Sequence, residues 1–193
     1  MKIDPGALAF DIDGVIADTM HLFMEILRED EGIRIHYDDI TCYQLETCLD
    51  VDLSILEAVI DKILSGRYQQ TLSPIPGAKA VLERIIAVTG RVLMVTARPD
   101  DALIREWMKG FLGNNAAKAD IVATGAFEAK ADVLHKNQIR WFVEDRIETC
   151  RLLKAEGIEP VVFRQPWNRV PHEFIEVGSW SDLERWIAFP AHT

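Results

Sequence analysis

The feature that most constrains the fold is a series of short apolar runs separated by segments with helical spacing. The runs at 7–10, 92–95, 121–123, 141–143 and 161–163 predict buried strands. Helices are predicted at about 78–88, 101–112, 127–136, 147–156 and 179–186. Strands that alternate with helices form parallel sheets, whose ligands bind at the carboxyl ends of the strands. The chain is therefore expected to be an α/β protein with a doubly wound parallel sheet.

One long segment departs from this alternation. Residues 19–75 carry helical spacing near 18–30 and 51–65 but no strand run, and prolines punctuate the segment's end. We expect a core domain made of residues 1–18 and 76–193. Residues 19–75 should form a small helical cap, inserted after the first strand and lying over the active edge of the sheet.

Composition narrows the range of partners. The 193 residues include 31 acidic and 21 basic side chains, a formal net charge of -10, so nucleic-acid polymers and anionic membranes are not expected partners. No apolar run approaches the roughly 18 residues of a membrane span, and no secretory signal is evident. The three cysteines, at 42, 48 and 150, are expected to be reduced thiols. These features predict a soluble cytoplasmic protein and leave a small anionic substrate possible.

Two carboxylates follow the first predicted strand directly. In the extended stretch Asp11-Ile12-Asp13-Gly14, side chains two residues apart face the same way, so Asp11 and Asp13 can converge. Gly14 allows a sharp turn that exposes backbone N–H groups to an anion. Alone, this pattern is more typical of a polar strand end followed by a turn than of a catalytic site.

Further polar groups stand at later strand ends and helix starts. Thr96 and Ala97 end the second predicted strand and offer a hydroxyl and a backbone N–H to phosphate oxygens. Lys130 lies near the start of a predicted helix, where its charge and the helix dipole both favour an anion. Glu144 and Asp145 form a carboxylate pair suited to Mg²⁺. The order of the whole set indicates phosphate chemistry.

This ordered set resembles the haloacid dehalogenase superfamily of phosphohydrolases over nearly the whole chain. The details are most similar to its 5′(3′)-deoxyribonucleotidase type, on the stretches Phe10-Asp11-Ile12-Asp13-Gly14-Val15-Ile16-Ala17-Asp18, Thr96-Ala97-Arg98-Pro99, Phe142-Val143-Glu144-Asp145-Arg146 and Gln165-Pro166-Trp167-Asn168-Arg169. One departure is Glu144, where that type commonly has a second aspartate.

The resemblance implies a Mg²⁺-dependent phosphatase that works through an aspartyl-phosphate. Asp11 would be the nucleophile and Asp13 the general acid and base. Asp11, the backbone carbonyl of Asp13, and Asp145 would bind the metal, and Glu144 would reach it through water. Phosphate would be held by the set Gly14, Thr96, Ala97 and Lys130.

Several roles stay open. Arg98 could hold phosphate or pair with an acidic neighbour, Trp141 is expected in the core, and Trp167 could be structural or functional. Candidate walls of the substrate pocket are Phe23, Met24, Tyr37, Tyr43 and Tyr68. Three functions remain: a phosphatase acting on nucleoside monophosphates, one acting on a sugar phosphate or other small metabolite, and a non-catalytic protein on this fold.

Overall fold

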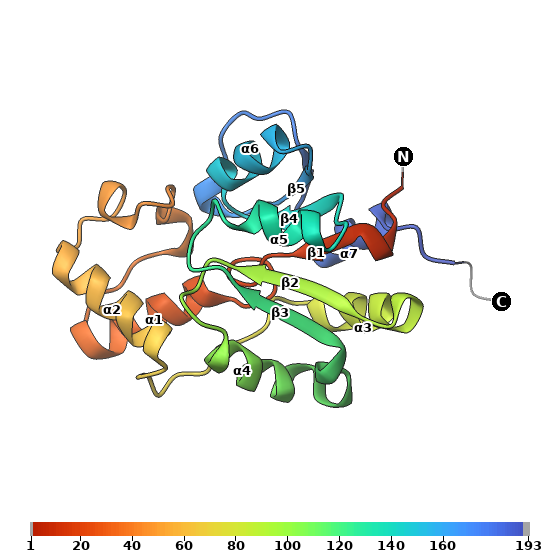
Figure 1. Cartoon of the computed structure of the whole chain (residues 1–193). Coiled ribbons are helices and arrows are strands. Elements are labelled where there is room, and N and C mark those ends of the chain that lie inside the picture. The colour runs from red at the N-terminus through yellow and green to blue at the C-terminus, as the bar shows by residue number, and fades with distance from the viewer. Residues whose placement is uncertain (1, 191–193) are drawn as a thin grey trace.

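The computed structural model describes residues 2–190, which fold around one six-stranded parallel sheet (Figure 1). The strands lie in the order β3-β2-β1-β4-β5-β6. Their bounds are Leu8–Phe10 for β1, Val92–Thr96 for β2, Ala119–Ala123 for β3, Trp141–Glu144 for β4, Glu159–Phe163 for β5 and Ile175–Val177 for β6. Because β1 lies between β2 and β4, the order reverses there, and ligands bind at such switch points. The predicted α/β class is confirmed.

The sixth strand, β6, is absent from the sequence prediction. It pairs with β5 at the edge of the sheet, with Val161 opposite Ile175 and Phe163 opposite Val177. Only three residues long and partly exposed, it lacks the continuous apolar run that indicates a buried strand.

Helices cover both faces of the sheet. Their bounds in the core are Ala78–Thr89 for α3, Ala102–Leu112 for α4, Lys130–Lys136 for α5, Ile147–Ala155 for α6 and Trp180–Trp186 for α7. The alternation along β1 separates two apolar clusters. Phe10 packs in the larger cluster with residues of α3 and α7, whereas Ala9 packs in the smaller one with residues of α5 and α6. The result is a three-layer sandwich that leaves the carboxyl end of β1 between its neighbours.

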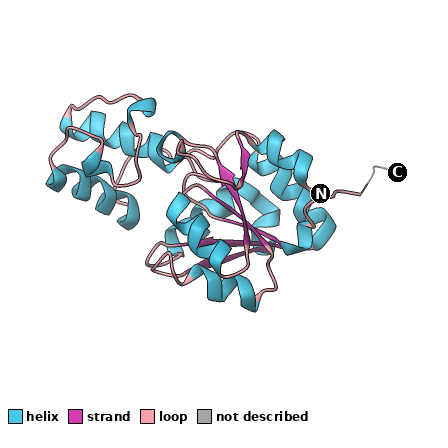
Figure 2. Cartoon of the chain, turned by 90° about the horizontal axis from the view of Figure 1, so that it is seen from above, coloured by secondary structure: helices cyan, strands magenta, loops and turns pink. Residues whose placement is uncertain are grey.

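The helical insertion follows β1 and stands to one side of the sheet (Figure 2). It contains α1 (Thr19–Glu31), α2 (Leu53–Ser65) and two short 3₁₀ helices, η2 (Tyr37–Asp39) and η3 (Leu45–Thr47). Asp18 caps α1 by accepting the backbone N–H of His21. The chain enters and leaves the insertion side by side, since the N–H of Asp18 donates to the carbonyl of Ser73 over 2.8 Å. The exact boundaries 18/19 and 75/76 stay predictions.

The insertion also corrects the expectation for the cysteines. Cys42 and Cys48 form a disulfide with Cα atoms 6.0 Å apart, so these two are not free thiols. Cys150 is free and buried on α6. The sequence prediction was wrong for the first two because a six-residue separation matches no disulfide or metal motif.

Across residues 2–190, none of the helices combines the length and the apolar character that crossing a membrane requires.

Candidate active site

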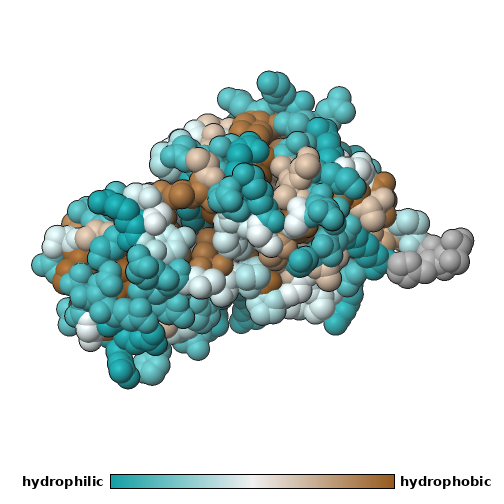
Figure 3. Space-filling view, turned by 90° about the horizontal axis from the view of Figure 1, so that it is seen from below, coloured by the Kyte–Doolittle hydropathy of each residue, from teal (hydrophilic) through white to brown (hydrophobic). Residues whose placement is uncertain are grey.

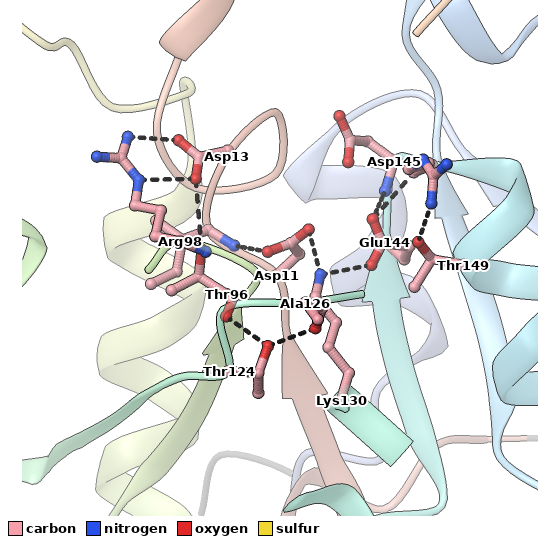
Figure 4. Close-up of polar contacts among 12 residues, drawn as sticks. Asp11, Asp13, Thr96, Arg98, Thr124, Ala126, Lys130, Glu144, Asp145 and Thr149 are labelled. Atoms are coloured by element: carbon pink, nitrogen blue, oxygen red, sulfur yellow. Dashed lines mark hydrogen bonds and ion pairs between the residues drawn. The ribbon is translucent and has the colours of Figure 1, made fainter. Parts of the chain in front are cut away.

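A buried lysine joins two carboxylates at the centre of the site. Asp11 follows the end of β1, and Lys130, the first residue of α5, is fully buried beside it. Its Nζ donates to Asp11 Oδ2 over 2.7 Å and to Glu144 Oε2 over 2.8 Å (Figure 4). Burial alone would lower the pKa of Lys130, but the two carboxylates outweigh it and raise that pKa above the ordinary lysine value. Lys130 is therefore a permanent positive charge.

Asp11, Glu144 and Asp145 form a compact buried carboxylate cluster. One oxygen from each lies within 4.8 Å of the others. Burial first, and the charge of Glu144 second, raise the pKa of both Asp11 and Asp145 well above the ordinary aspartate value. Three carboxylates beside the single ammonium of Lys130 leave two uncompensated negative charges when all are ionised. Oxygen ligands with this charge fit a hard divalent cation such as Mg²⁺.

Both carboxylate oxygens of Glu144 accept hydrogen bonds. Its Oε1 accepts the backbone N–H groups of Asp145 and Arg146, over 3.2 and 3.1 Å, while its Oε2 accepts from Lys130. Burial would raise the pKa of Glu144, but Lys130 outweighs it, so the net shift is downward. Glu144 therefore fixes Lys130 and the turn after β4. Its contact with a metal through water stays a prediction, as does the carbonyl of Asp13 as a ligand.

The carboxylate of Asp13 faces Arg98 rather than Asp11. Arg98 Nε donates to Asp13 Oδ2 over 2.9 Å and Nη2 to Oδ1 over 2.7 Å (Figure 4). The hydroxyl of Thr19, the first residue of α1, also donates to this carboxylate. Burial would raise the pKa of Asp13, but Arg98 outweighs it and the pKa is lowered. Arg98 therefore pairs with an acidic neighbour, and its contact with phosphate stays a prediction.

Three of the four predicted phosphate-binding residues, Gly14, Thr96 and Ala97, line the same cavity as this pair. Thr96, buried at the end of β2, donates its hydroxyl to Asp13 over 3.4 Å and accepts the backbone N–H of Arg98 over 3.2 Å. Ala97 and Gly14 line the same cavity, which also contains Asp11 and Asp13. Their contact with phosphate stays a prediction.

Glycine is required at position 14. Its φ of +72° lies in the left-handed region, and a Cβ there would stand 2.1 Å from Asp145 Oδ2. The turn after β1 thus packs directly against Asp145. A side chain at this position would displace the carboxylate cluster.

The cavity, of about 440 Å³, extends from these polar groups to the insertion. Its wall on the insertion is mainly apolar, although Thr19, Glu46 and Glu57 also line it. The apolar and aromatic residues of this wall are Met20, Phe23, Tyr43, Leu45, Leu53, Leu56, Ile60, Ile63 and Leu64. The space-filling view shows hydrophobic surface where the smaller and larger parts of the molecule meet (Figure 3). The site therefore joins a charged end in the core to an apolar end in the insertion.

Two of the five candidate wall residues, Phe23 and Tyr43, line this cavity. Met24 packs against the main apolar cluster. Tyr37 donates its hydroxyl to Gln165 over 2.7 Å, and Tyr68 lines a separate hollow beside α4. Trp141 is buried in the core, as expected.

Sequence reasoning missed the long-range contacts of Arg146 and left the role of Trp167 open. Arg146 lies 4.2 Å above the Phe127 ring and 4.9 Å above that of Tyr43, which joins the core to the insertion. Trp167 donates its indole N–H to Asp145 Oδ2 over 2.9 Å. The only sequence signal for either was its place in a stretch that resembles a known family.

The family comparison tests whether the chain resembles only the superfamily or also its deoxyribonucleotidase type. The model of the family described as 5′ nucleotidase, deoxy (pyrimidine), cytosolic type C protein matches residues 6–192. The chain belongs to this family. Members of the cytosolic type C family are phosphoric monoester hydrolases, so the expected enzyme class and a small phosphorylated substrate are confirmed. No curated protein matches the chain significantly in sequence.

Solved structures of the haloacid dehalogenase superfamily share the fold. A hydrolase of that superfamily from Ehrlichia chaffeensis has a TM-score of 0.60 at 15% identity, with 96% of each chain covered. CbbY from Rhodobacter sphaeroides, in complex with phosphate, has a TM-score of 0.59 at 15% identity and covers 95% of this chain and 96% of its own. A predicted phosphoglycolate phosphatase from Haemophilus somnus has a TM-score of 0.62 at 12% identity, covering 93% and 96%. Identities this low show the fold alone.

Proposed function

We propose that this chain is a Mg²⁺-dependent 5′(3′)-(deoxy)ribonucleotidase that hydrolyses nucleoside monophosphates through an aspartyl-phosphate. The observation that carries the proposal is the buried set of Asp11, Lys130 and Asp145, with Asp13 in the same cavity. A carboxylate nucleophile requires nearby positive charge to approach a phosphate dianion. Lys130 supplies one such charge, and a divalent cation at the carboxylate cluster supplies the rest when it is bound.

In the first half-reaction an oxygen of Asp11 bonds to phosphorus, and the bond between phosphorus and the nucleoside oxygen breaks. That oxygen takes a proton from Asp13 and leaves as an alcohol. In the second half, a water molecule gives a proton to Asp13, its oxygen bonds to phosphorus, and the bond to Asp11 breaks. Inorganic phosphate is released and Asp11 is restored.

The apolar wall of the insertion supports a nucleoside as leaving group. A nucleobase has two flat apolar faces, which Phe23 and Tyr43 and the aliphatic side chains of α2 can contact. A hexose has hydroxyl groups around the edge of its ring, and burial of a hydroxyl without a hydrogen-bond partner is costly. The composition of the wall therefore favours nucleotides over sugar phosphates.

The test is phosphate release from a panel of deoxyribonucleotides, ribonucleotides and hexose phosphates with Mg²⁺. Nucleotides should exceed hexose phosphates in kcat/KM by about ten- to a hundredfold, the usual worth of one stacked aromatic contact. Hexose phosphates that lead by that margin would favour the sugar-phosphate reading. No release from any monoester would leave the non-catalytic reading.

A pair of variants shows whether the wall contributes. Ile60 and Leu152 are similarly exposed, at 41% and 42%, but only Ile60 lines the cavity. Ile60→Ser should lower kcat/KM for nucleotides about three- to tenfold, since a buried methylene contributes about 0.8 kcal/mol. Leu152→Ser should leave it unchanged. Equal effects would remove the support that the wall gives to the nucleotide reading.

A cytoplasmic location stays a prediction. That prediction rested partly on the small number of cysteines, which were expected to be reduced thiols. The disulfide between Cys42 and Cys48 contradicts that expectation for two of the three.

A further inference from the structure

A buried tryptophan holds one oxygen of a carboxylate in the buried cluster. The indole Nε1 of Trp167 donates to Oδ2 of Asp145 over 2.9 Å, and the two residues are only 7% and 5% exposed. An indole has a single N–H, with a direction fixed by its rigid ring. The contact therefore fixes the orientation of the carboxylate as well as its position.

The loop that carries Trp167 is itself held rigidly. Asn168, fully buried, donates its amide to the backbone carbonyls of Asp145 and Phe163, each over 2.8 Å. The side-chain oxygen of Asn168 accepts the backbone N–H of Gln165 over 2.9 Å. Residues 165–168 thus bind the main chain of Asp145 independently of the indole, so the indole N–H has a separate role.

The same loop reaches the turn after β1. Gln165 Nε2 donates to the backbone carbonyl of Gly14 over 2.7 Å, and a Cβ on Gly14 would lie 3.2 Å from the Trp167 ring. Both segments that bring carboxylates to the cluster, the one after β1 and the one after β4, are therefore fastened to one loop.

We propose that Trp167 is a positioning residue that presents Asp145 to the divalent cation. The indole N–H occupies Oδ2 and leaves Oδ1 of Asp145 for the cation. Partners of this kind, which hydrogen-bond to a ligating carboxylate, change metal affinity by about ten- to a hundredfold when they are removed. This inference rests on the proposed function, because it requires a cation at the carboxylate cluster.

The test compares Trp167→Phe with Trp107→Phe by calorimetric titration of the metal-free proteins with Mg²⁺. Phenylalanine keeps an aromatic ring in the loop but loses the N–H. Trp107 is the matched control, since its Nε1 donates over 2.7 Å to the carbonyl of Leu72, and it does not line the active-site cavity. The Kd for Mg²⁺ should rise ten- to a hundredfold in Trp167→Phe and stay within twofold in Trp107→Phe.

Activity separates positioning from a structural role. Trp167→Phe should need more Mg²⁺ for half-maximal activity but regain a kcat within about threefold of wild type at saturating Mg²⁺, because only metal affinity is lowered. An unchanged Kd in a folded Trp167→Phe overturns the inference while the proposed function stands. A wild-type protein that binds no Mg²⁺ and keeps full activity in chelator overturns the metal dependence itself, and the inference with it.

A second measurement needs no Trp167 variant to fold. In the indole region of a ¹H–¹⁵N spectrum of the wild-type protein, Mg²⁺ should shift an indole N–H resonance other than that of Trp107, which Trp107→Phe assigns. If no indole N–H resonance shifts at saturating Mg²⁺, the role proposed for Trp167 is contradicted.

Discussion

Arg98 holds both oxygens of Asp13, with its Nε 2.9 Å from Oδ2 and its Nη2 2.7 Å from Oδ1. Residues 85 positions apart thus form a two-pronged ion pair in which the Arg98 side chain is 7% exposed. The pair favours the ionised form of Asp13, which accepts a proton from water in the second half-reaction. It opposes the protonated form, which Asp13 needs in order to donate a proton to the leaving group in the first half-reaction. It also fixes the orientation from which Asp13 serves the leaving group.

Arg98→Lys keeps the positive charge but loses the planar fork, so Asp13 should become less well oriented. We expect kcat for a nucleoside monophosphate to fall about ten- to a hundredfold, the cost of a small misplacement of a reacting group. Steady-state kinetics check this. The loss should be much smaller for p-nitrophenyl phosphate, whose leaving group needs less protonation. Equal losses for the two substrates would mean that Arg98 acts on the phosphate and not through Asp13.

Asp11→Asn should abolish turnover and stabilise the metal-free protein. The amide lacks the charge and nucleophilicity of the carboxylate. It also removes a buried carboxyl whose pKa is raised by burial and by Glu144, while Lys130 keeps its ion pair with Glu144. A group with a raised folded pKa costs stability when it is ionised at neutral pH. Thermal unfolding in chelator should give a higher Tm for the variant. The increase should be about 2–4 °C for each 1 kcal/mol added to the free energy of unfolding. Activity within tenfold of wild type, or a lower Tm, would contradict the account.

Removal of Mg²⁺ with a chelator should abolish activity, and Ca²⁺ should restore it poorly. Ca²⁺ is larger and accepts looser coordination, so it would align Asp11 and phosphorus less well. A phosphate-release assay with each cation in excess checks this. Full activity with Ca²⁺ would indicate that coordination geometry at Asp145 does not matter for the reaction.

Lys130→Met should destabilise the metal-free protein strongly. The change leaves Asp11 and Glu144 buried without their shared cation, and breaking a buried ion pair from one side costs about 3–5 kcal/mol. Urea unfolding measures the difference. The control is Lys154→Met, which breaks the exposed pair with Glu159 and should cost about 0–1 kcal/mol. Similar losses of stability in the two variants would show that the buried pairs of Lys130 stabilise the protein no more than the exposed pair of Lys154.

The inner strands of the sheet could be predicted from the sequence because they are buried on both faces. Val92–Thr96 and Trp141–Glu144 are fully buried and therefore consist of continuous apolar runs up to their polar ends. The edge strand Ile175–Val177 has no such run and was missed. The helix predicted to begin at about residue 127 begins at Lys130 in the structure.

The site could be predicted only as a set of residues at strand ends. Topology brings Asp11, Thr96 and Asp145 to one edge of the sheet, and periodicity is enough to predict that. The pairing of Arg98 with Asp13, and of Trp167 with Asp145, depends on side-chain directions that the packing of distant segments decides. Spacing along the chain contains no information on those directions.

The central claim is that phosphate is transferred to Asp11, and Asp13→Asn is the variant that exposes the transfer. Loss of the acid should slow release of a nucleoside about 10²–10⁴-fold, but should slow release of p-nitrophenolate much less. Hydrolysis of the aspartyl-phosphate should be slow for both, because the base that activates water is missing. The most direct measurement is rapid acid quenching of Asp13→Asn with phosphate-labelled p-nitrophenyl phosphate, followed by peptide mapping. The account predicts a burst of p-nitrophenolate close to one per site and label on the peptide that contains Asp11. Continued turnover with no labelled protein, or label on another residue, would contradict it.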